Sequence, residues 1–453
     1  MKKYEIFRRK YPQFVYKNFG WEIIGKDLRV FFDFRIPPKI SFSPEIIIKN
    51  IPVFRIKSLG QGIVDNFVFN LGLIESLSYW KTTCSSEILV ECGYLDSEQK
   101  KFWQKLLIKG MSQYFYENKI NFRAKNFLKI VPLVSDPNDT FFTIVKNVSY
   151  LKERFLVPMS GGKDSIVTFE LLKKAGKDVG CFCLNPNSAT KQVLKVGECQ
   201  NPIIIERRID PLLLEMNKPS RQNFSGKNSN RRGFLNGHTP FSALLAFLSV
   251  FVGVLFDYKY IAFSNERSAN EGNVRYLGSV INHQYSKSFE FEQDFRKYCR
   301  RYLAKNIEYF SLLRPLFELQ IVKIFSQYPK YFKVFSGCNR YQAGKTRGRK
   351  WCGQCPKCLF VFICLQAFLG IGETKKIFGK DLSADKNLLG LKQQLLGERG
   401  FKPFECVGTA RETKAALANG KQLIDILNSW GEKHNLVQGL IKLLKSALKY
   451  GHT

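Results

Sequence analysis

The sequence predicts an α/β protein built on a parallel sheet with helices on both faces. From residue 151 onwards, apolar runs that read as strands alternate with stretches of helical apolar spacing, a rhythm typical of βαβ units. A glycine-rich stretch joins the first of these strands to its helix. We expect an N-terminal α+β domain over residues 1–150, the α/β domain over 151–370 and a helical C-terminal region over 371–453.

The N-terminal region mixes strand-like and helical patterns. The stretches "LRVFFDFRI" and "EIIIKNIPVFRI" predict strands, and "DNFVFNLGLIESLSYWK" has the apolar spacing of a helix. A second helix, "SEQKKFWQKLLIKG", is predicted after Asp96, which suits an N-cap because Gln99 follows three residues later. Nothing in this region indicates catalysis by itself.

The α/β region has predicted strands at "RFLVPMS", "DVGCFCLNPN" and "PIIIER", and binding residues belong at the carboxyl ends of such parallel strands. The apolar run at 241–256 is shorter than the ~20 residues that a membrane span needs. We expect a buried helix instead, with Thr239 as N-cap and Pro240 at the first helical position. The polar, basic stretch at 218–238 predicts either a disordered insertion or a lid over an anionic substrate.

The stretch "PMSGGKDS" places two glycines directly after an apolar strand. Gly161 and Gly162 let an anion approach the main chain closely, and the following helix, which ends near Gly176, offers free N–H groups at its start. The spacing matches neither the P-loop nor the dinucleotide fingerprint. We therefore predict a different phosphate-binding loop; the alternative is a glycine turn with an exposed lysine.

Four cysteines form a compact pattern late in the α/β region. They are Cys338, Cys352, Cys355 and Cys358, the last three spaced as CxxCxxC. Four thiolates suit a structural zinc ion, which leaves no open position for chemistry. An iron–sulfur cluster and free buried thiols are the alternatives.

Few residues offer acid–base chemistry. His238 precedes the apolar helix, whose dipole is expected to lower the imidazole pKa, and His283 lies among polar residues in "NHQYSKS". Either can instead be a structural histidine. The stretch "SNERSANEGN" follows a predicted strand, and its density of polar groups predicts contact with a ligand. Its candidates are Glu266, Arg267, Asn270 and Glu271.

The composition is strongly basic. The 453 residues include 71 Lys and Arg against 38 Asp and Glu, a formal net charge of +33. This charge suits an anionic ligand, nucleic acid or a membrane surface. A genome biased towards A/T codons is an equally good explanation, because such codons enrich a protein in Lys, Ile, Phe and Asn. The N-terminal "MKKYEIFRRKYPQF" lacks the apolar segment of a signal peptide. We expect a cytoplasmic protein whose twelve cysteines remain thiols or metal ligands.

Stretches between about residues 60 and 410 carry a family resemblance. They are "FVFNLGLIESLSYWK", "PMSGGKDSIVTFELL", "SNERSANEGN", "NHQYSKSFEFE", "FSGCNR", "WCGQCPKCLFVF" and "PFECVG". Together they resemble the MurL type of ATP-dependent UDP-N-acetylmuramoyl-L-alanyl-L-glutamate epimerases of peptidoglycan synthesis. The loop SGGKDS also resembles the pyrophosphate (PP) loop of the ATP-pyrophosphatase superfamily. The loop and the cysteines are similar to those of the enzymes that make 7-cyano-7-deazaguanine, which carry zinc there.

The resemblance implies an activity and a substrate. The protein would invert the terminal L-Glu of UDP-N-acetylmuramoyl-L-Ala-L-Glu to D-Glu while ATP becomes AMP and pyrophosphate. It implies that the loop holds pyrophosphate and that Asp164 holds Mg²⁺. The loop residues are Ser160, Gly161, Gly162, Lys163 and Ser165. The candidates for proton transfer are His238, His283, Cys406 and Glu266.

The chemistry explains why ATP is consumed. A free carboxylate makes the neighbouring Cα–H very weakly acidic, and adenylation turns it into an ester-like acyl group from which a positioned base can remove the proton. The amide oxygen of the Ala–Glu bond closing on the adenylate, to give an oxazolone, is a further hypothesis. We expect Lys163 to be an exposed loop lysine whose loss abolishes AMP formation and leaves the fold intact.

Two other functions compete with the epimerase. One is a nucleobase- or tRNA-modifying enzyme that uses the same adenylating loop, and it would suit the basic charge. The other is a non-catalytic nucleic-acid-binding protein, which is weaker because neither an aromatic RNA-binding signature nor a helix-turn-helix stands out. The stretches "SNERSANEGN" and "PFECVG" favour the epimerase.

Overall fold

A computed structural model describes residues 1–134, 151–217, 233–346, 348–418 and 420–449. Its main sheet contains β1 (Gln13–Ile24), β2 (Asp27–Ile36), β3 (Ile40–Phe42), β4 (Glu45–Ile48), β5 (Glu87–Val90), β6 (Lys129–Pro132), β7 (Lys152–Pro158), β8 (Val179–Leu184), β9 (Ile203–Arg208), β10 (Tyr258–Phe263) and β13 (Glu308–Ser311). The order across the sheet is β13-β10-β7-β8-β9-β4-β2-β1-β5-β6, and β3 pairs with β2. A separate hairpin joins β11 (Val274–Tyr276) to β12 (Ser279–Ile281).

The helices surround this sheet on both sides. They are α1 (Lys3–Lys10), α2 (Val53–Leu59), α3 (Gln61–Trp80), α4 (Ser97–Gly110), α5 (Ser112–Glu117), α6 (Lys163–Lys174), α7 (Ser188–Val196), α8 (Pro211–Met216), α9 (Phe241–Leu255), α10 (Phe289–Tyr298), α11 (Glu318–Phe325), α12 (Asn339–Gln342), α13 (Pro356–Phe378), α14 (Leu389–Leu395), α15 (Ala410–Ala418), α16 (Lys421–Leu427) and α17 (Leu440–Lys449). The mostly parallel sheet, the flanking helices and the helical C-terminal region confirm the fold class predicted from the sequence.

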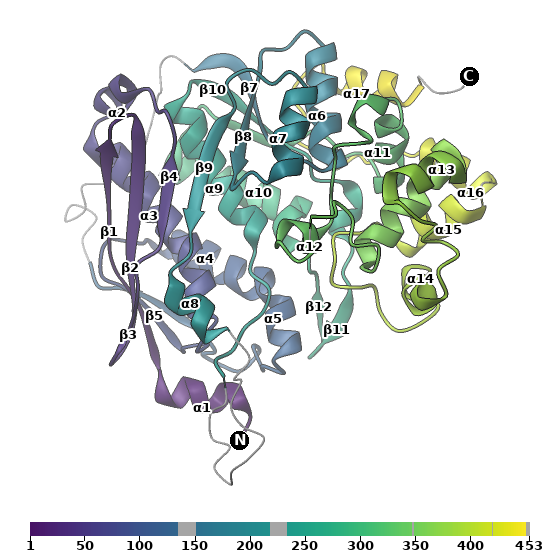
Figure 1. Cartoon of the computed structure of the whole chain (residues 1–453). Helices are drawn as coiled ribbons and strands as arrows, with labels where there is room; N and C mark the ends of the chain where they lie inside the picture. Colours follow the sequence, from purple (N-terminus) through teal and green to yellow (C-terminus); the bar gives the residue numbers. More distant parts are fainter. Residues whose placement is uncertain (135–150, 218–232, 347, 419, 450–453) are drawn as a thin grey trace.

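Side chains of a single strand alternate between two apolar cores, one on each face of the sheet. In β7, Leu156 belongs to the core under α3 and α9, whereas Phe155 and Val157 belong to the core under α6, α11 and α13. This alternation follows from the two-residue period of a strand. Figure 1 shows α6 and α7 in front of the parallel strands, α3 and α9 behind them, and α13 to α16 gathered at one end of the molecule.

The N-terminal strands continue the parallel strands rather than forming a second sheet. Strand β4 pairs antiparallel with β9, for example Ile47 with Glu206. The parallel pairs of β7 with β8 and β10, and of β8 with β9, then place the carboxyl ends of these strands along one edge. The domain boundaries at residues 150 and 370 stay predictions.

Most of the expected helix ends are found. Asp96 caps α4 by accepting a hydrogen bond from the amide of Gln99, at 2.7 Å, and Gly176 follows α6 in the left-handed conformation. Two expectations are wrong. Helix α9 begins at Phe241 with Pro240 as N-cap, because the carbonyl of Thr239 already accepts from Phe241 N. Residues 53–56 were expected in a strand and lie in α2, since Pro52 breaks the extended run and caps this helix.

Within the described residues, one helix is long and apolar enough to cross a membrane, namely α13. Half of its apolar window is buried inside the protein. Gly370, at φ 73° and ψ 170°, is not helical and divides the segment in two. Of the stretch at 218–238, expected to be an insertion or a lid, residues 218–232 lie outside the described residues.

Candidate functional site

The SGGKDS loop connects β7 to α6 at the carboxyl edge of the parallel strands. Gly161 has a φ of 81°, and a Cβ there would lie 3.1 Å from the backbone nitrogen of Thr190, so only glycine fits. Thr190 also donates from its hydroxyl to the carbonyl of Ser160, at 3.1 Å. Gly162 is the N-cap of α6, so the first turn of the helix points its N–H groups at the space above the loop.

A pocket opens beside this loop. Its polar lining comes from Ser160, Asp164, Ser165, Ser264, Asn265 and Lys287. Its apolar lining includes Phe182 and Leu184 of β8 and Phe241 and Leu245 of α9. The volume of this open pocket is about 160 Å³, similar to the roughly 150 Å³ cavity that holds one benzene ring. The pocket therefore offers room for an aromatic ring next to a loop suited to phosphate.

Lys163 lies beneath the loop and is only 4% exposed. Its ammonium forms ion pairs with the carboxylates of Asp164 and of Glu318, the first residue of α11. The expectation of an exposed lysine is therefore wrong: the first turn of α6 packs against α11, and two acidic side chains hold the ammonium in the interior.

The charges around Lys163 do not balance. Burial opposes the ionised form of Asp164, but the ammonium of Lys163 outweighs it and lowers the pKa of this carboxyl. Burial, followed by the charge of Asp164, raises the pKa of Glu318 to about 8, although the ammonium of Lys163 opposes this rise. Among the described residues, Glu266 is 1% exposed and its Oε1 has no hydrogen-bond partner. This acidic group therefore has a free buried acceptor, which a ligand or ion can satisfy.

A second cluster forms around Cys406. Its Sγ lies 4.0 Å from Nε2 of His283, and Nδ1 of the same ring lies 2.5 Å from Oε1 of Gln113 in α5. The Gln113 oxygen accepts only, so Nδ1 carries a proton and Nε2 is turned towards the sulfur. Burial would raise the pKa of Cys406, but Lys287, His283 and Lys357 outweigh it and lower this pKa to about 5. Cys406 is therefore a thiolate at neutral pH.

His238 lies against the same cluster, with its ring centroid 4.5 Å from that of His283. Burial, and then the charges of His283 and Lys81, lower the pKa of His238 to about 3. The expected direction is confirmed, but the main cause is burial rather than the dipole of α9. At neutral pH His238 is an uncharged imidazole.

Asn273 fixes the positions of Cys406 and His283 relative to each other. Its Nδ2 donates to the carbonyls of Lys402 and Pro403, at 3.1 and 2.8 Å. Its Oδ1 accepts from the amide of His283, at 2.9 Å. The loop that carries the cysteine is thereby tied to the segment that carries the histidine.

Lys287 lies between the two clusters. It lines the pocket beside Asp164. Burial lowers its pKa, but the charges of Cys406, Glu266, Asp164 and Glu318 outweigh burial and raise it. A cation is thus held within electrostatic reach of both the phosphate-type loop and the thiolate.

The four cysteines meet as the sequence predicts. The ligand atoms of Cys338, Cys352, Cys355 and Cys358 all lie within 4.8 Å of one another, so they could hold a metal ion. The sulfur of Cys358 is 3.4 Å from that of Cys355 and 3.6 Å from that of Cys352. Four sulfurs at about 2.3 Å from a tetrahedral zinc have similar separations. Ser336, two residues before Cys338, donates its amide to the carbonyl of Gly161 at 2.9 Å, which links this cluster to the loop.

The structure groups the predicted residues into two neighbouring clusters. The loop residues and Glu266 form one cluster, His238, His283 and Cys406 form the other, and Lys287 feels charges from both. The other three candidates of SNERSANEGN make contacts within the protein: Asn270 accepts from the amide of Phe289, Arg267 stacks on Phe317, and Glu271 pairs with Lys402. Sequence reasoning missed Gln113 and Glu318, which no motif marks, and also Asn273 and Lys287, which lie within the quoted "SNERSANEGN" and "NHQYSKS".

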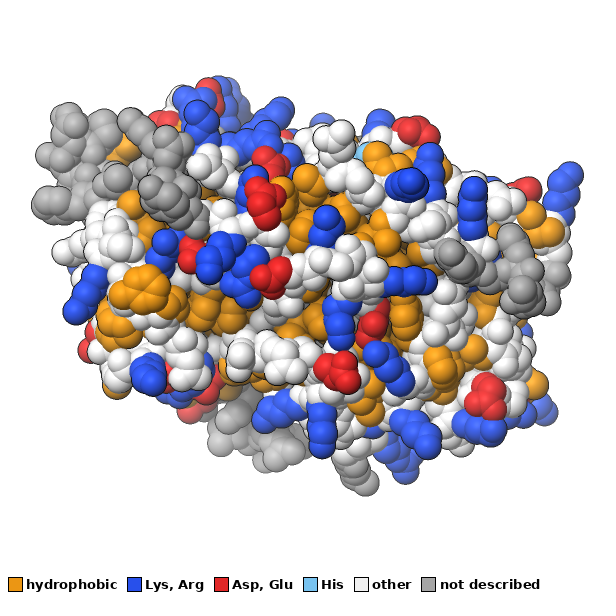
Figure 2. Space-filling view, turned by 90° about the horizontal axis from the view of Figure 1, so that it is seen from above, with side chains coloured by type: hydrophobic (Ala, Val, Ile, Leu, Met, Phe, Trp, Pro, Cys, Tyr) orange, Lys and Arg blue, Asp and Glu red, His pale blue; other side chains and the backbone are white. Residues whose placement is uncertain are grey.

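Basic side chains spread over the surface. Figure 2 shows many Lys and Arg side chains distributed across one face, with fewer acidic ones between them. On this face the positive charge is thus not confined to one patch.

The fold and the two clusters give an α/β protein with a candidate site at the carboxyl edge of a parallel sheet. Comparison with known proteins shows its family. The family model for the MurL N-terminal domain matches residues 6–312, and that for the MurL C-terminal domain matches residues 334–449. The chain belongs to the MurL family and is an amino-acid epimerase.

Three proteins named UDP-N-acetyl-alpha-D-muramoyl-L-alanyl-L-glutamate epimerase are similar to this chain. That of Xanthomonas oryzae pv. oryzae is 32% identical over 351 residues, covering 77% of this chain and 73% of that protein. That of Micromonospora sp. is 33% identical over 350 residues, with 77% and 73% covered. That of Salinispora tropica is 34% identical over 352 residues, with 77% and 71% covered.

Proposed function

We propose that this protein converts the terminal L-Glu of UDP-N-acetylmuramoyl-L-Ala-L-Glu to D-Glu, with ATP cleaved to AMP and pyrophosphate, in peptidoglycan synthesis. The observation that carries the proposal is that Lys287 lines the pocket beside the loop and is also within electrostatic reach of Cys406, so the two clusters are neighbours. One cluster has the features of an ATP-binding loop, and the other combines a thiolate with two imidazoles. The names of the three relatives support the substrate.

The loop is proposed to act as the pyrophosphate loop of the PP-loop superfamily. Ser160, Gly161, Gly162 and Ser165 would surround the phosphates at the start of α6, where N–H groups and the helix dipole favour negative charge. The apolar lining beside the loop gives the adenine ring a place to pack. Asp164 would hold Mg²⁺, which neutralises charge on the departing pyrophosphate.

The acid–base chemistry is proposed to take place at the second cluster. Once the glutamate carboxylate is joined to AMP, the neighbouring Cα–H becomes acidic enough for a protein base. His238 and His283 lie side by side, and Lys287 would stabilise the negative charge that develops on the acyl oxygen. The distribution of positive charge over the surface suits a substrate with a diphosphate and two carboxylates.

The four-cysteine cluster is proposed to hold structural zinc. Four sulfur ligands complete a tetrahedral shell, so the ion would stabilise the loop that carries Ser336 rather than take part in the reaction. We also infer that the protein works in the cytoplasm on a small nucleotide-linked substrate rather than at a membrane.

Isotope exchange tests the proposed function. The protein is incubated with UDP-N-acetylmuramoyl-L-Ala-L-Glu, ATP and Mg²⁺ in heavy water, and the glutamate Cα is expected to gain deuterium only when ATP is present. Acid hydrolysis is expected to release D-Glu, with AMP formed alongside. Asp164→Asn is expected to lose both products, whereas Asp178→Asn, at an exposed ion pair with Arg154, is expected to keep them. ATP cleavage stimulated by tRNA or a deazaguanine precursor, without exchange, would favour the alternative enzyme.

A further inference from the structure

The order of groups at Cys406 is that of an activated nucleophile. The sulfur faces the Nε2 atom of His283, and the Nδ1 atom of that ring is fixed by the amide oxygen of Gln113. A thiol next to a base that is itself oriented by a third group is the arrangement found in enzymes that form covalent acyl intermediates.

We propose that Cys406 accepts the activated glutamyl group as a thioester, and that the Cα proton is lost from this thioester rather than from the adenylate. The inference rests on the proposed function and adds a covalent intermediate to it. It also assigns different roles to the cysteine and to the two histidines, which the sequence offered only as equivalent candidates.

Each step balances. The glutamate carboxylate attacks the α-phosphorus of ATP and pyrophosphate leaves. The Cys406 thiolate then attacks the acyl carbon, a C–S bond forms, and the C–O bond breaks with its electron pair going to AMP. The Nε2 atom of His283 takes the Cα proton, and the planar enolate receives a proton on its other face from a ring N–H of His238, which regains a proton from the adjacent His283 ring. Water adds to the thioester and the C–S bond breaks, which releases the carboxylate, gives two protons to solvent and regenerates the thiolate.

Basicity favours acyl transfer over proton abstraction as the role of this sulfur. A general base works best when its pKa is near the working pH, and Cys406 has its pKa lowered to about 5. Such a thiolate is a weak base for a Cα–H, yet it stays ionised and nucleophilic at neutral pH. A thioester also acidifies the Cα–H more than an oxygen ester, because sulfur donates less electron density to the carbonyl.

Access and charge at the site agree with this role. Cys406 is half-buried, whereas Cys84, Cys299 and Cys364 are buried. Lys287 places an ammonium group within electrostatic reach of the sulfur and of Asp164. The acyl group therefore moves from the adenylate beside Asp164 to the sulfur of Cys406 while it stays near the ammonium of Lys287. This ammonium can stabilise the negative charge of the tetrahedral adduct and then of the enolate.

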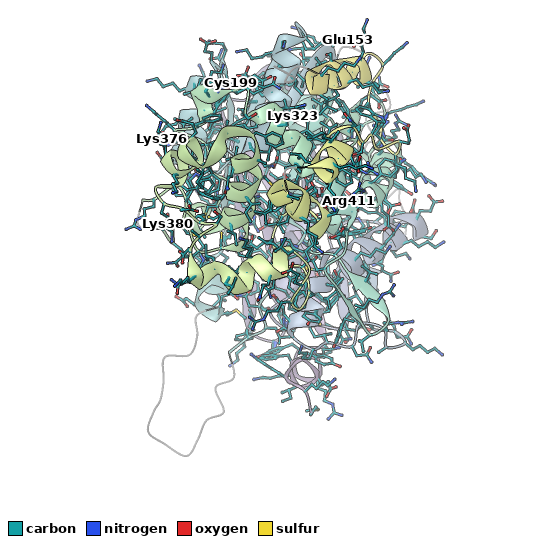
Figure 3. All side chains as sticks on the ribbon, turned by 90° about the vertical axis from the view of Figure 1, so that its right-hand side faces the viewer. Glu153, Cys199, Lys323, Lys376, Lys380 and Arg411 are labelled. Atoms are coloured by element: carbon teal, nitrogen blue, oxygen red, sulfur yellow. The ribbon has the colours of Figure 1, made fainter. Side chains whose placement is uncertain are left out.

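Intact-protein mass spectrometry tests the thioester directly. The full-length protein is mixed with UDP-N-acetylmuramoyl-L-Ala-L-Glu, ATP and Mg²⁺ and quenched in acid within the first turnover. We expect a mass increase equal to the substrate minus water, located on Cys406 by peptide mapping and removed by neutral hydroxylamine. Cys199→Ala, at a half-buried cysteine on α7's side of the protein (labelled in Figure 3), is expected to keep the adduct.

Cys406→Ala and Cys406→Ser separate acyl transfer from acid–base catalysis. Both variants are expected to exchange labelled pyrophosphate into ATP when substrate is present, which also shows that they are folded. AMP release and deuterium exchange are expected to fall by more than about 100-fold, as when a catalytic nucleophile is removed. AMP release at the wild-type rate, or epimerisation by wild type without an adduct, overturns the thioester and leaves the epimerase assignment standing. Wild type that makes neither pyrophosphate nor D-Glu overturns both.

Discussion

Arg314 and Glu292 form an ion pair in the interior, with each side chain 1% exposed and Nη2 3.0 Å from Oε2. The same guanidinium donates to the carbonyl oxygens of Glu266 and Lys287, at 2.8 and 2.7 Å. Asn435, in the C-terminal region, donates to the other oxygen of Glu292. One buried ion pair thus fixes the main chain on which two residues of the candidate site are carried.

Arg314→Met is expected to destabilise the protein by about 3–5 kcal/mol, because it leaves the carboxylate of Glu292 buried without its partner. The double variant Arg314→Met/Glu292→Met is expected to recover much of this stability but little of the pyrophosphate formation, since the carbonyls of Glu266 and Lys287 remain unheld. Denaturant unfolding and pyrophosphate release are the two measurements. Full activity in the stable double variant would contradict a positioning role for Arg314.

Lys163→Ala is expected to lower stability as well as activity, contrary to what an exposed lysine would do. It leaves Asp164 and Glu318 facing each other without an ammonium, at a cost of about 3 kcal/mol. Adding Glu318→Gln is expected to restore stability, because only one buried acid then remains. AMP formation should stay low in both variants. An unchanged unfolding midpoint for Lys163→Ala would refute the buried ion pair; Lys173→Ala, at a half-exposed lysine further along α6, serves as the control.

Alkylation of Cys406 is expected to follow an ionisation near pH 5 rather than near 9, the ordinary value of a thiol. The groups that face this sulfur are Lys287, His283 and Lys357, which lower its pKa, and Glu405, which lies beside it. Because the folded pKa is the lower one, the ionisation stabilises the fold fully above pH 9, progressively less between pH 9 and 5, and not at all below.

The rate of iodoacetamide labelling against pH, read at Cys406 by mass spectrometry, measures this ionisation. Lys287→Met is expected to raise the apparent pKa, because it removes the largest of the lowering charges. Labelling that rises only above pH 8 in the wild type would show that the sulfur is an ordinary thiol.

Cys355→Ser is expected to lose the metal ion and much of the stability of the C-terminal half. The purified protein should carry about one zinc ion per chain, and metal binding contributes to folding free energy. Cys364→Ser is the matched control, since this cysteine is buried on the same helix but outside the cluster. Because Ser336 N donates to Gly161, exchange of that amide with solvent should quicken in Cys355→Ser alone. A metal-free wild type of equal stability would exclude the zinc site.

The sequence predicted the architecture better than the contacts. Alternation of strands and helices is a local pattern, so the parallel strands, the cysteine cluster and the loop at the start of α6 could be read directly. The pairing of Cys406 with His283 joins residues 123 positions apart, and no local pattern specifies it. Glu318 and Gln113 sit in ordinary helical sequence, and they matter because tertiary packing brings α11 to Lys163 and α5 to His283.

Two of the wrong predictions, for Lys163 and for residues 53–56, also have physical explanations. Lys163 reads as exposed because lysine usually is, and only the approach of α11 provides the carboxylate that makes its burial tolerable. Residues 53–56 have strand-forming side chains, yet Pro52 starts a helix and leaves Ile56 as the residue that faces the core. In both places the outcome depends on a neighbour distant in sequence or on one proline, rather than on average composition.

The antiparallel join between β4 and β9 has a consequence for how the molecule responds to ligands. Four consecutive residue pairs, from Glu45–Arg208 to Ile48–Ile205, fasten the first strands of the chain to the strand next to β8. Dividing the protein between β4 and β9 would leave each of these strands as an unpaired sheet edge that is prone to aggregation. Tightening of the loop on a bound ligand should therefore slow amide exchange in β4 and β2, which lie two and three strands away from β8.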